Sequence, residues 1–213
     1  MLSEQEAAAL QNSAARVGER VQAELRARPG VEYALTFVEN LHRSMDKTIR
    51  QANERGQPME CQAGCASCCS VRVEVSPVEA LWLARQLRAW PEARQQALHQ
   101  RLQQRLTLFE MTMETSPRRE CVLLENNLCS VYAWRPASCR KAHSFSATAC
   151  QSQAATIPQD LAITMAAEAL QRGMAQGYRL AGLPSAPMEL TAALQWALSC
   201  PDVEAAWYHA ARE

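Results

Sequence analysis

The sequence lacks the patterns of several common protein classes. Its 22 Lys and Arg balance its 22 Asp and Glu, so the formal net charge is zero. Proteins that bind nucleic acid or an anionic membrane surface usually carry a basic excess, so this balance argues against both as partners. No serine–histidine–aspartate order, phosphate-binding loop or dinucleotide fingerprint is visible. No reaction is therefore indicated by a familiar catalytic motif.

Long apolar segments are also missing. No run approaches the roughly 18 apolar residues that would indicate a membrane span. The opening MLSEQEAAALQNSAARVGER is too polar and charged to predict an export signal. We therefore expect a cytoplasmic protein. Because the cytoplasm keeps thiols reduced, a concentration of cysteines there indicates a metal or redox site rather than a disulfide framework.

Cysteine is absent from the first 60 residues but is concentrated in the middle of the chain. Eight of the nine cysteines lie in two groups, which a long helical insert separates. The groups are Cys61, Cys65, Cys68 and Cys69, and Cys121, Cys129, Cys139 and Cys150. We interpret all eight as ligands of a metal centre assembled by the fold, the alternative being free thiols buried as small hydrophobes. Cys200, which precedes Pro201, is expected to be such a buried structural thiol.

The donor type and spacing narrow the choice of metal. Thiolates select zinc, copper(I) and iron–sulfur clusters. Structural zinc prefers paired C-x2-C segments, and no C-x2-C…C-x2-C ribbon is present. The C-x3-C-x2-C spacing of Cys61, Cys65 and Cys68 matches the loop that holds a 4Fe–4S cluster in radical SAM enzymes, although the β/α barrel of those enzymes is not indicated. The spacing therefore favours a 4Fe–4S cluster, with zinc as the alternative.

The adjacent pair Cys68-Cys69 is difficult to place around one centre, because successive side chains diverge in most backbone conformations. Eight thiolates would complete two four-sulfur centres, or one cluster and a zinc ion. Cations in the same region would offset the negative charge of thiolates around a metal and donate hydrogen bonds to sulfur. These cations are Arg72, Arg118, Arg119, Arg135, Arg140 and Lys141.

Most of the remaining sequence predicts helices. Ser3 and Glu6 form a capping-box signature at the start of the first helix, and Pro29-Gly30 ends it. VRVEV, residues 71–75, predicts a short strand, and Asn126-Asn127 predicts the turn of a small hairpin. The other expected helices span 31–55, 76–89 and about 91–115, and begin near Pro158, Pro187 and Pro201.

These patterns predict a mainly α fold, with a helical scaffold around an irregular, cysteine-rich metal-binding centre that contains a short hairpin. We expect residues 1–213 to form a single domain. Within it, residues 1–60 form an N-terminal helical pair, 61–150 the metal-binding region with its helical insert, and 151–213 the C-terminal helices. A metal would stabilise the centre, since ligand bonds supply folding free energy that a thin core does not.

The cysteine segments resemble the YkgJ-like cysteine-cluster family, bacterial proteins described as carrying a zinc- or iron-chelating domain. CQAGCASCC is similar to the family's C-x2/3-C-x2-C-C packet. CSVYAWRPASCR is similar to its C-x-I-Y-x-x-R-P-x-x-C-R segment, with Val131 in place of isoleucine. The resemblance covers residues 61–150, with Cys150 as the counterpart of a further downstream cysteine. It implies a metal-chelating domain, and an enzymatic role exists in one relative, a flagellin lysine methylase.

The sequence leaves three functions open. The first is a metalloprotein that holds an iron–sulfur cluster or another metal through both cysteine groups. The second is a metal-dependent enzyme that acts on a protein or peptide substrate. The third is a zinc-binding structural, carrier or sensor protein. Beside the ligands we expect Arg135 and Arg140, and we expect His143 as a further ligand or proton carrier, the alternative being a solvated histidine.

Overall fold

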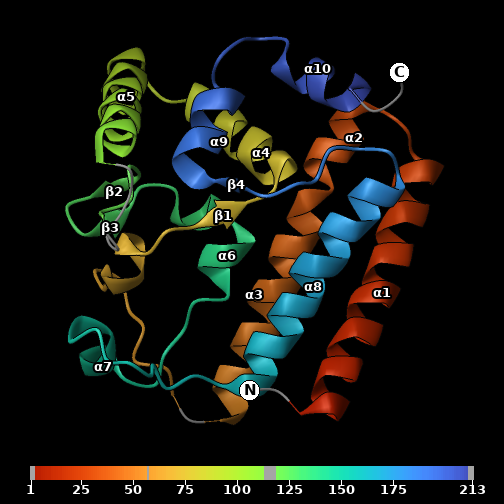
Figure 1. Ribbon diagram of the computed structural model, residues 1–213, viewed down its shortest axis with the longest axis vertical. Coiled ribbons are helices and arrows are strands. Elements are labelled where there is room, and N and C mark those ends of the chain that lie inside the picture. Colours follow the sequence, from red (N-terminus) through yellow and green to blue (C-terminus); the bar gives the residue numbers. More distant parts are fainter. Residues whose placement is uncertain (1–2, 57, 113–118, 211–213) are drawn as a thin grey trace.

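The computed structural model describes residues 3–56, 58–112 and 119–210. Over these residues the chain is mainly helical, as predicted, and the strands form two short antiparallel pairs. In Figure 1 the long helices α1, α3 and α8 lie on one side of the molecule, β2, β3 and α7 lie on the other, and α6 lies between them. No described helix combines the length and apolar composition that crossing a membrane requires.

The most extensive contact between two helices joins the N-terminal helix to a helix in the last third of the sequence. α1 (Glu4–Ala27) begins at the predicted Ser3 cap and packs along α8 (Leu161–Leu180). Gly173 and Gly177 of α8 face α1, and a Cβ atom at either position would collide with α1 backbone and valine side chains. The absence of side chains there lets the two helices approach closely, and α3 packs on the same α8.

The predicted second helix is divided in two. α2 (Val31–Thr36) and α3 (Val38–Arg55) are separated by Phe37, so the prediction of one continuous helix is wrong. The Thr36 hydroxyl donates a hydrogen bond to the Glu32 carbonyl oxygen at 2.9 Å, and hydroxyl bonds of this kind bend helices. Phe37 packs against the hydrophobic core, which holds the bend in place.

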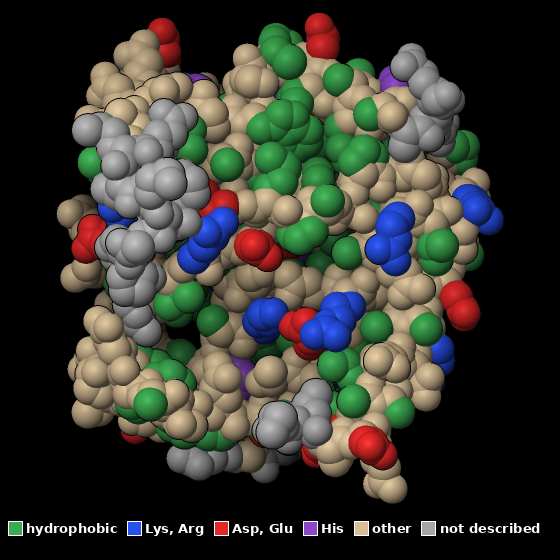
Figure 2. Space-filling view, viewed as in Figure 1, with side chains coloured by type: hydrophobic (Ala, Val, Ile, Leu, Met, Phe, Trp, Pro, Cys, Tyr) green, Lys and Arg blue, Asp and Glu red, His purple; other side chains and the backbone are tan. Residues whose placement is uncertain are grey.

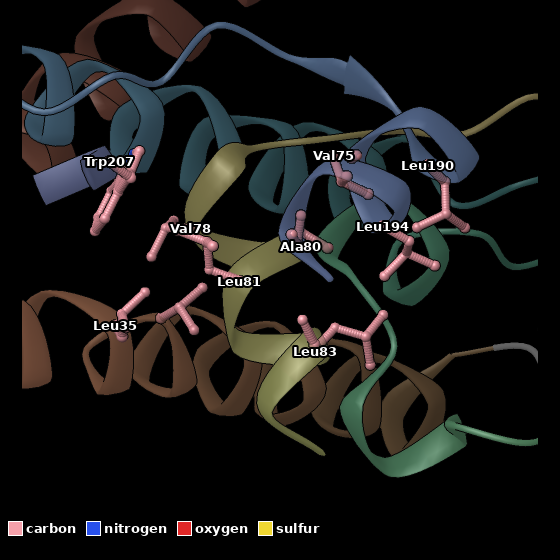
Figure 3. Close-up of a cluster of buried hydrophobic side chains, with 14 of the residues drawn as sticks. Leu35, Val75, Val78, Ala80, Leu81, Leu83, Leu190, Leu194 and Trp207 are labelled. Carbon is pink, nitrogen blue, oxygen red and sulfur yellow. The ribbon is translucent and has the colours of Figure 1, made fainter. Parts of the chain in front are cut away.

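α4 (Pro77–Arg88) is the central helix of the core. It begins at the predicted Ser76 cap, with Glu79 returning to the Ser76 backbone N–H. Figure 3 shows its buried side chains, among them Leu81 and Leu83, between residues of α2, α9 and α10. The strand that follows the first cysteine group leads straight into α4, so this core adjoins the cysteine-rich segments.

The remaining predicted helices are confirmed, but the short helices within the cysteine-rich centre were not predicted. The start sites expected near Pro158, Pro187 and Pro201 each precede a helix by two or three residues. The expected end of the insert helix, near residue 115, and Arg118 lie outside the described residues. The helices whose bounds have not yet been given are α5 (Glu92–Thr112), α6 (Ala137–Arg140), α7 (Ala147–Gln151), α9 (Leu190–Ala197), α10 (Val203–His209) and the 3-10 helices η1 (Ser67–Ser70) and η2 (Tyr132–Trp134).

The predicted strand over residues 71–75 is shorter than expected. Only β1 (Glu74–Val75) pairs, antiparallel to β4 (Met188–Glu189). One further backbone bond, from the Leu190 N–H to the Val73 carbonyl oxygen at 2.9 Å, extends the contact before α9 begins. The pairing ends there because the partner strand turns into a helix.

The small hairpin is confirmed. β2 (Leu124–Glu125) pairs with β3 (Leu128–Cys129), and the turn residues Asn126 and Asn127 have φ values of 51° and 60°. Tight hairpin turns require positive φ at both central residues, and asparagine tolerates this conformation better than most residues. The turn places Cys129 opposite Leu124, back toward Cys121.

Candidate metal centre

One cleft brings the two cysteine groups together. Its volume is about 1330 Å³, and all eight predicted cysteine ligands line it. The face shown in Figure 2 is hollowed near its centre, with acidic and basic side chains along the edge of the hollow. All nine cysteines are free thiols, and Cys200 is exposed away from the cleft, so the prediction of a buried thiol at Cys200 is wrong.

Backbone hydrogen bonds attach the end of the first group to the start of the second. The Cys121 N–H donates to the Cys69 carbonyl oxygen at 2.7 Å, and the Arg119 N–H donates to the Ser70 carbonyl oxygen at 3.1 Å. These two bonds run in the manner of a short ladder. They place Cys69 and Cys121 next to each other, although α4 and α5 separate them in the sequence.

A second set of bonds attaches the start of the first group to the end of the second. The Glu60 N–H donates to the Ser144 carbonyl oxygen at 3.1 Å, and the Cys61 sulfur lies 3.9 Å from the same oxygen. The Glu60 carboxylate accepts a hydrogen bond from the Ala147 N–H at 2.6 Å, at the start of α7. α7 carries Cys150 and contacts η1.

Cys68 and Cys69 lie in η1, where the chain makes a tight 3-10 turn. Their thiols hydrogen-bond to each other, so they do not diverge as far as the sequence suggested. The Cys69 thiol lowers the pKa of Cys68 to about 6, with a smaller contribution from the positive charge of Arg135. The same bond raises the pKa of Cys69. Of the two, Cys68 is the more exposed.

Burial governs the other perturbed thiols. It raises the pKa of Cys61, Cys121, Cys129 and Cys139, and neighbouring thiolates add to the effect on all four. A thiol with a raised pKa keeps its proton at neutral pH until a metal displaces it. Metal binding in this cleft would therefore release protons.

The donor set fits a soft or borderline metal, since eight free thiols line one cleft. Among the described residues, however, no three His, Cys, Asp or Glu side chains are already grouped so as to hold one ion. The eight thiols line the cleft, but their sulfur atoms do not converge on one position where a metal ion could bind. Rotation of cysteine side chains between their staggered conformers is the adjustment that binding would require.

Glu79 positions the helix that carries Cys139, a role that the sequence did not reveal. The carboxylate is buried and accepts a hydrogen bond from the Ala137 N–H at 2.7 Å, at the start of α6. His42 Nε2 lies 3.2 Å from the same oxygen. Burial opposes the charged form, but hydrogen bonds from His42, Ala137 and Ser76 outweigh it and lower the pKa of Glu79.

Arg140 does not line the cleft. Its guanidinium, 3% exposed, pairs with Asp46 of α3 and donates to the carbonyl oxygens of Ala133 at 2.6 Å and Arg135 at 2.8 Å. These contacts hold the loop between Cys129 and Cys139 against α3. Its N–H groups therefore donate to backbone and carboxylate oxygens, whereas the sequence-based prediction had them directed at sulfur.

Arg135 does line the cleft. Its guanidinium stacks on the Tyr132 ring, 3.9 Å from the centroid, and donates to the Tyr132 carbonyl oxygen at 2.8 Å. Its charge favours the thiolate forms of Cys68 and Cys129. Arg135 is thus one of the sequence-predicted cations beside the thiols, and Arg72, Arg119 and Lys141 also line the cleft.

His143 is buried, and backbone groups engage both of its ring nitrogens. The Asp160 N–H donates to Nε2 at 3.0 Å, so Nε2 is unprotonated and Nδ1–H donates to the Lys141 carbonyl oxygen at 2.8 Å. The ring lines the cleft and joins the loop after α6 to the start of α8. The solvated alternative is wrong, and the two ring-nitrogen contacts favour a supporting role over metal ligation.

Arg105 of α5 is a cleft residue that sequence reasoning missed. It forms no hydrogen bond or ion pair with the residues that the structure describes, and its charge lies near the thiol of Cys121. Burial lowers the pKa of Arg105, and the neighbouring Arg119 adds to the effect. No local signal in the sequence separates this arginine from its neighbours on α5.

Comparison with known proteins agrees with the cysteine pattern. Residues 60–161 match a family model described as "CxxCxxCC: Putative zinc- or iron-chelating domain". No curated protein and no solved structure matched the chain. The matched range includes all eight cleft cysteines and leaves out Cys200, so it confirms the resemblance to the cysteine-cluster family and supports metal binding.

Proposed function

Since residues 60–161 belong to the CxxCxxCC family of zinc- or iron-chelating domains, we propose that this chain is a cytoplasmic metalloprotein that holds an iron–sulfur cluster in its thiol cleft. The observation that carries the proposal is the convergence of eight free thiols from two distant segments on one cleft. The ligands are proposed to come from the eight cleft cysteines, which are Cys61, Cys65, Cys68, Cys69, Cys121, Cys129, Cys139 and Cys150.

Two features favour a cluster of the 4Fe–4S type over zinc. The C-x3-C-x2-C loop of the first group has the spacing that wraps a cuboidal cluster. Arg135 and Arg105 supply positive charge beside the thiols, which would offset the negative charge of a thiolate-ligated cluster and tune its potential. When bound, such a cluster supplies electron transfer or Lewis acidity.

The rest of the chain would act as the support of this site within one domain. Residues 1–60 and 151–213 contribute α1, α3 and α8, which pack on one another beside the cleft. Glu79 fixes the start of α6 and Arg140 fixes the loop before it. These residues hold the ligands in place without using their own donors on the metal.

Purification without oxygen, followed by iron, acid-labile sulfide and zinc analysis, tests the proposal. We expect a coloured protein that contains iron and sulfide in equal amounts. A colourless protein with stoichiometric zinc would contradict the cluster and favour a zinc-binding structural, carrier or sensor protein. A protein without any metal would contradict the metal centre itself.

A second candidate function is a metal-dependent enzyme that acts on a protein or peptide. The cleft favours it, because about 1330 Å³ exceeds the volume typical of small-molecule sites and far exceeds that of a metal centre alone. Part of its wall comes from α8 and α9, which carry no proposed ligand. Ala175 of α8 lies in this wall.

The substitution Ala175→Trp separates the two functions. It would fill part of the cleft and leave the proposed ligands unchanged. If the protein is an enzyme, peptides treated with metal-loaded wild type should show a mass change that the variant no longer produces, at equal metal content. No mass change with the metal-loaded wild type would contradict the enzymatic role.

A further inference from the structure

We infer that the cleft holds two separate four-thiolate centres, an inner one packed on the hydrophobic core and an outer one open to exchange with solution. This inference rests on the proposed function, because it requires that the thiols bind metal. The inner centre comprises Cys69, Cys121, Cys129 and Cys139. The outer centre comprises Cys61, Cys65, Cys68 and Cys150.

The number of thiols exceeds what one centre uses. A 4Fe–4S cluster takes four cysteine ligands, and a structural zinc ion also takes four ligands. All eight cysteines line the cleft, so four would stay without a metal if only one centre formed. Two centres use every thiol in the cleft.

The inner set is built from elements that are fixed to one another. The backbone bond from Cys121 to Cys69 joins η1 to the segment before the hairpin. The hairpin carries Cys129 back toward Cys121, and both of these side chains pack against the hydrophobic core. α6 presents Cys139 from the third side, and buried Glu79 holds the start of that helix.

The outer set is built from different elements. The bonds between Glu60 and residues 144 and 147 join the start of the first cysteine group to the segment that leads into α7. Cys150 lies on α7, which contacts η1. In Figure 1, α7 and the β2–β3 hairpin lie on opposite sides of η1, so the two sets are on opposite sides of one turn.

Electrostatic neighbours divide in the same way except for Cys68, which acts on thiols of both sets. The thiols that act on Cys61 are those of Cys65, Cys68 and Cys150. Those that act on Cys139 are Cys121, Cys129 and Cys68. Cys68 therefore lies at the junction, and we place it in the outer set because it is exposed.

Exposure makes the two centres unequal. Two outer ligands, Cys61 and Cys68, are exposed, whereas the other two and all four inner cysteines are partly buried. A chelator can reach the outer ligands directly, but it reaches the inner ones only if core-packed elements move. The outer centre should therefore lose its metal first.

Metal analysis of single variants tests the assignment. The full chain is purified without oxygen as wild type, Cys61→Ser, Cys150→Ser and the control Cys200→Ser, and iron, sulfide and zinc are measured per chain. We expect wild type and Cys200→Ser to hold two centres. Each outer variant should lose one centre and keep the other, with unchanged helical circular dichroism. Loss of both centres from a folded outer variant, or loss of neither, would overturn the inference.

A second measurement follows the loss of metal over time. EDTA added to wild type should remove metal in two phases, and Cys150→Ser should lack the fast phase. A single phase in wild type would contradict two unequal centres. Wild type with one centre contradicts only this inference, whereas wild type with no metal contradicts the proposed function as well.

Discussion

Glu79 joins three helices through a single side chain. Its carboxylate caps α4 through Ser76, lies beside His42 of α3 and caps α6 at Ala137. A buried carboxylate without such partners would be strongly destabilising, and here every contact stabilises its charged form. The helix that carries Cys139 therefore depends on one ionised residue.

Glu79→Gln should lower the free energy of unfolding by about 2 kcal/mol, because hydrogen bonds to a charged group become bonds to a neutral one. The pKa of Glu79 is below its usual 4.5 in the folded state, so its contribution is complete above that pH and is lost as pH falls through the lower folded pKa. Urea denaturation at several pH values measures both effects.

The exposed substitution Glu19→Gln on α1 is the matched control and should change stability by less than about 0.5 kcal/mol. If Glu79→Gln behaved like this control, the buried carboxylate would have no structural role. If the difference from wild type persisted unchanged below the folded pKa, the charged form would not be what stabilises the fold.

Single residues also show where sequence reasoning stops. The cysteines and the Ser76–Glu79 cap follow from local spacing. The contacts of Glu79 with His42 and Ala137 span 37 and 58 residues, so no local pattern contains them. His143 was identified as a site residue, but the engagement of both its nitrogens depends on a chain segment that only the fold brings near.

At the scale of elements, the α1–α8 pair depends on missing side chains. A Cβ at Gly177 would lie 2.7 Å from the Gly18 carbonyl oxygen and would also strike Val21. The atoms nearest to a Cβ at Gly18 would be those of the flexible Gln176 side chain, at 3.2 Å. The two glycines face the same interface with very different room around them.

Gly177→Ala should lower the free energy of unfolding by about 2 kcal/mol, because overpacking outweighs the gain in helix propensity. Gly18→Ala is the matched control, and it should be neutral or slightly stabilising because Gln176 can move. Thermal unfolding of both variants measures the difference. Equal stability of the two variants would show that α1 and α8 do not pack this closely.

The elements themselves were predicted to different extents. Capping residues, proline and glycine determined most helix starts, and asparagine determined the hairpin turn. The pairing of β1 with β4 was not predictable, because two-residue strands leave no alternation to recognise and the partners are far apart in sequence. The break at Phe37 was also missed, because both sides of it have helical periodicity.

At the scale of the whole molecule, different interactions stabilise the helical layer, formed by α1, α3 and α8, and the segments that line the thiol cleft. α1, α3 and α8 pack on one another through apolar and glycine contacts, and none of them carries a proposed ligand. The segments around residues 60–76 and 119–155 contain short elements and many of the proposed ligands. Metal should therefore stabilise the second region far more than the first.

Removal of the metal should increase hydrogen exchange at residues 60–76 and 119–155 while the amides of α1 and α8 keep their protection. The physical reason is that ligand bonds supply the folding free energy of the cleft segments, whereas the helical layer has its own packing. Exchange measured by mass spectrometry, with and without chelator, gives the comparison. Equal loss of protection in both regions would contradict separate supports.

X-ray absorption at the metal edge of protein purified without oxygen tests the central claim most directly, because it reports the atoms bound to the metal. We predict a first shell of sulfur alone, at about 2.3 Å, for iron or for zinc. A first shell dominated by nitrogen or oxygen would contradict the assignment of the cleft cysteines as the metal ligands.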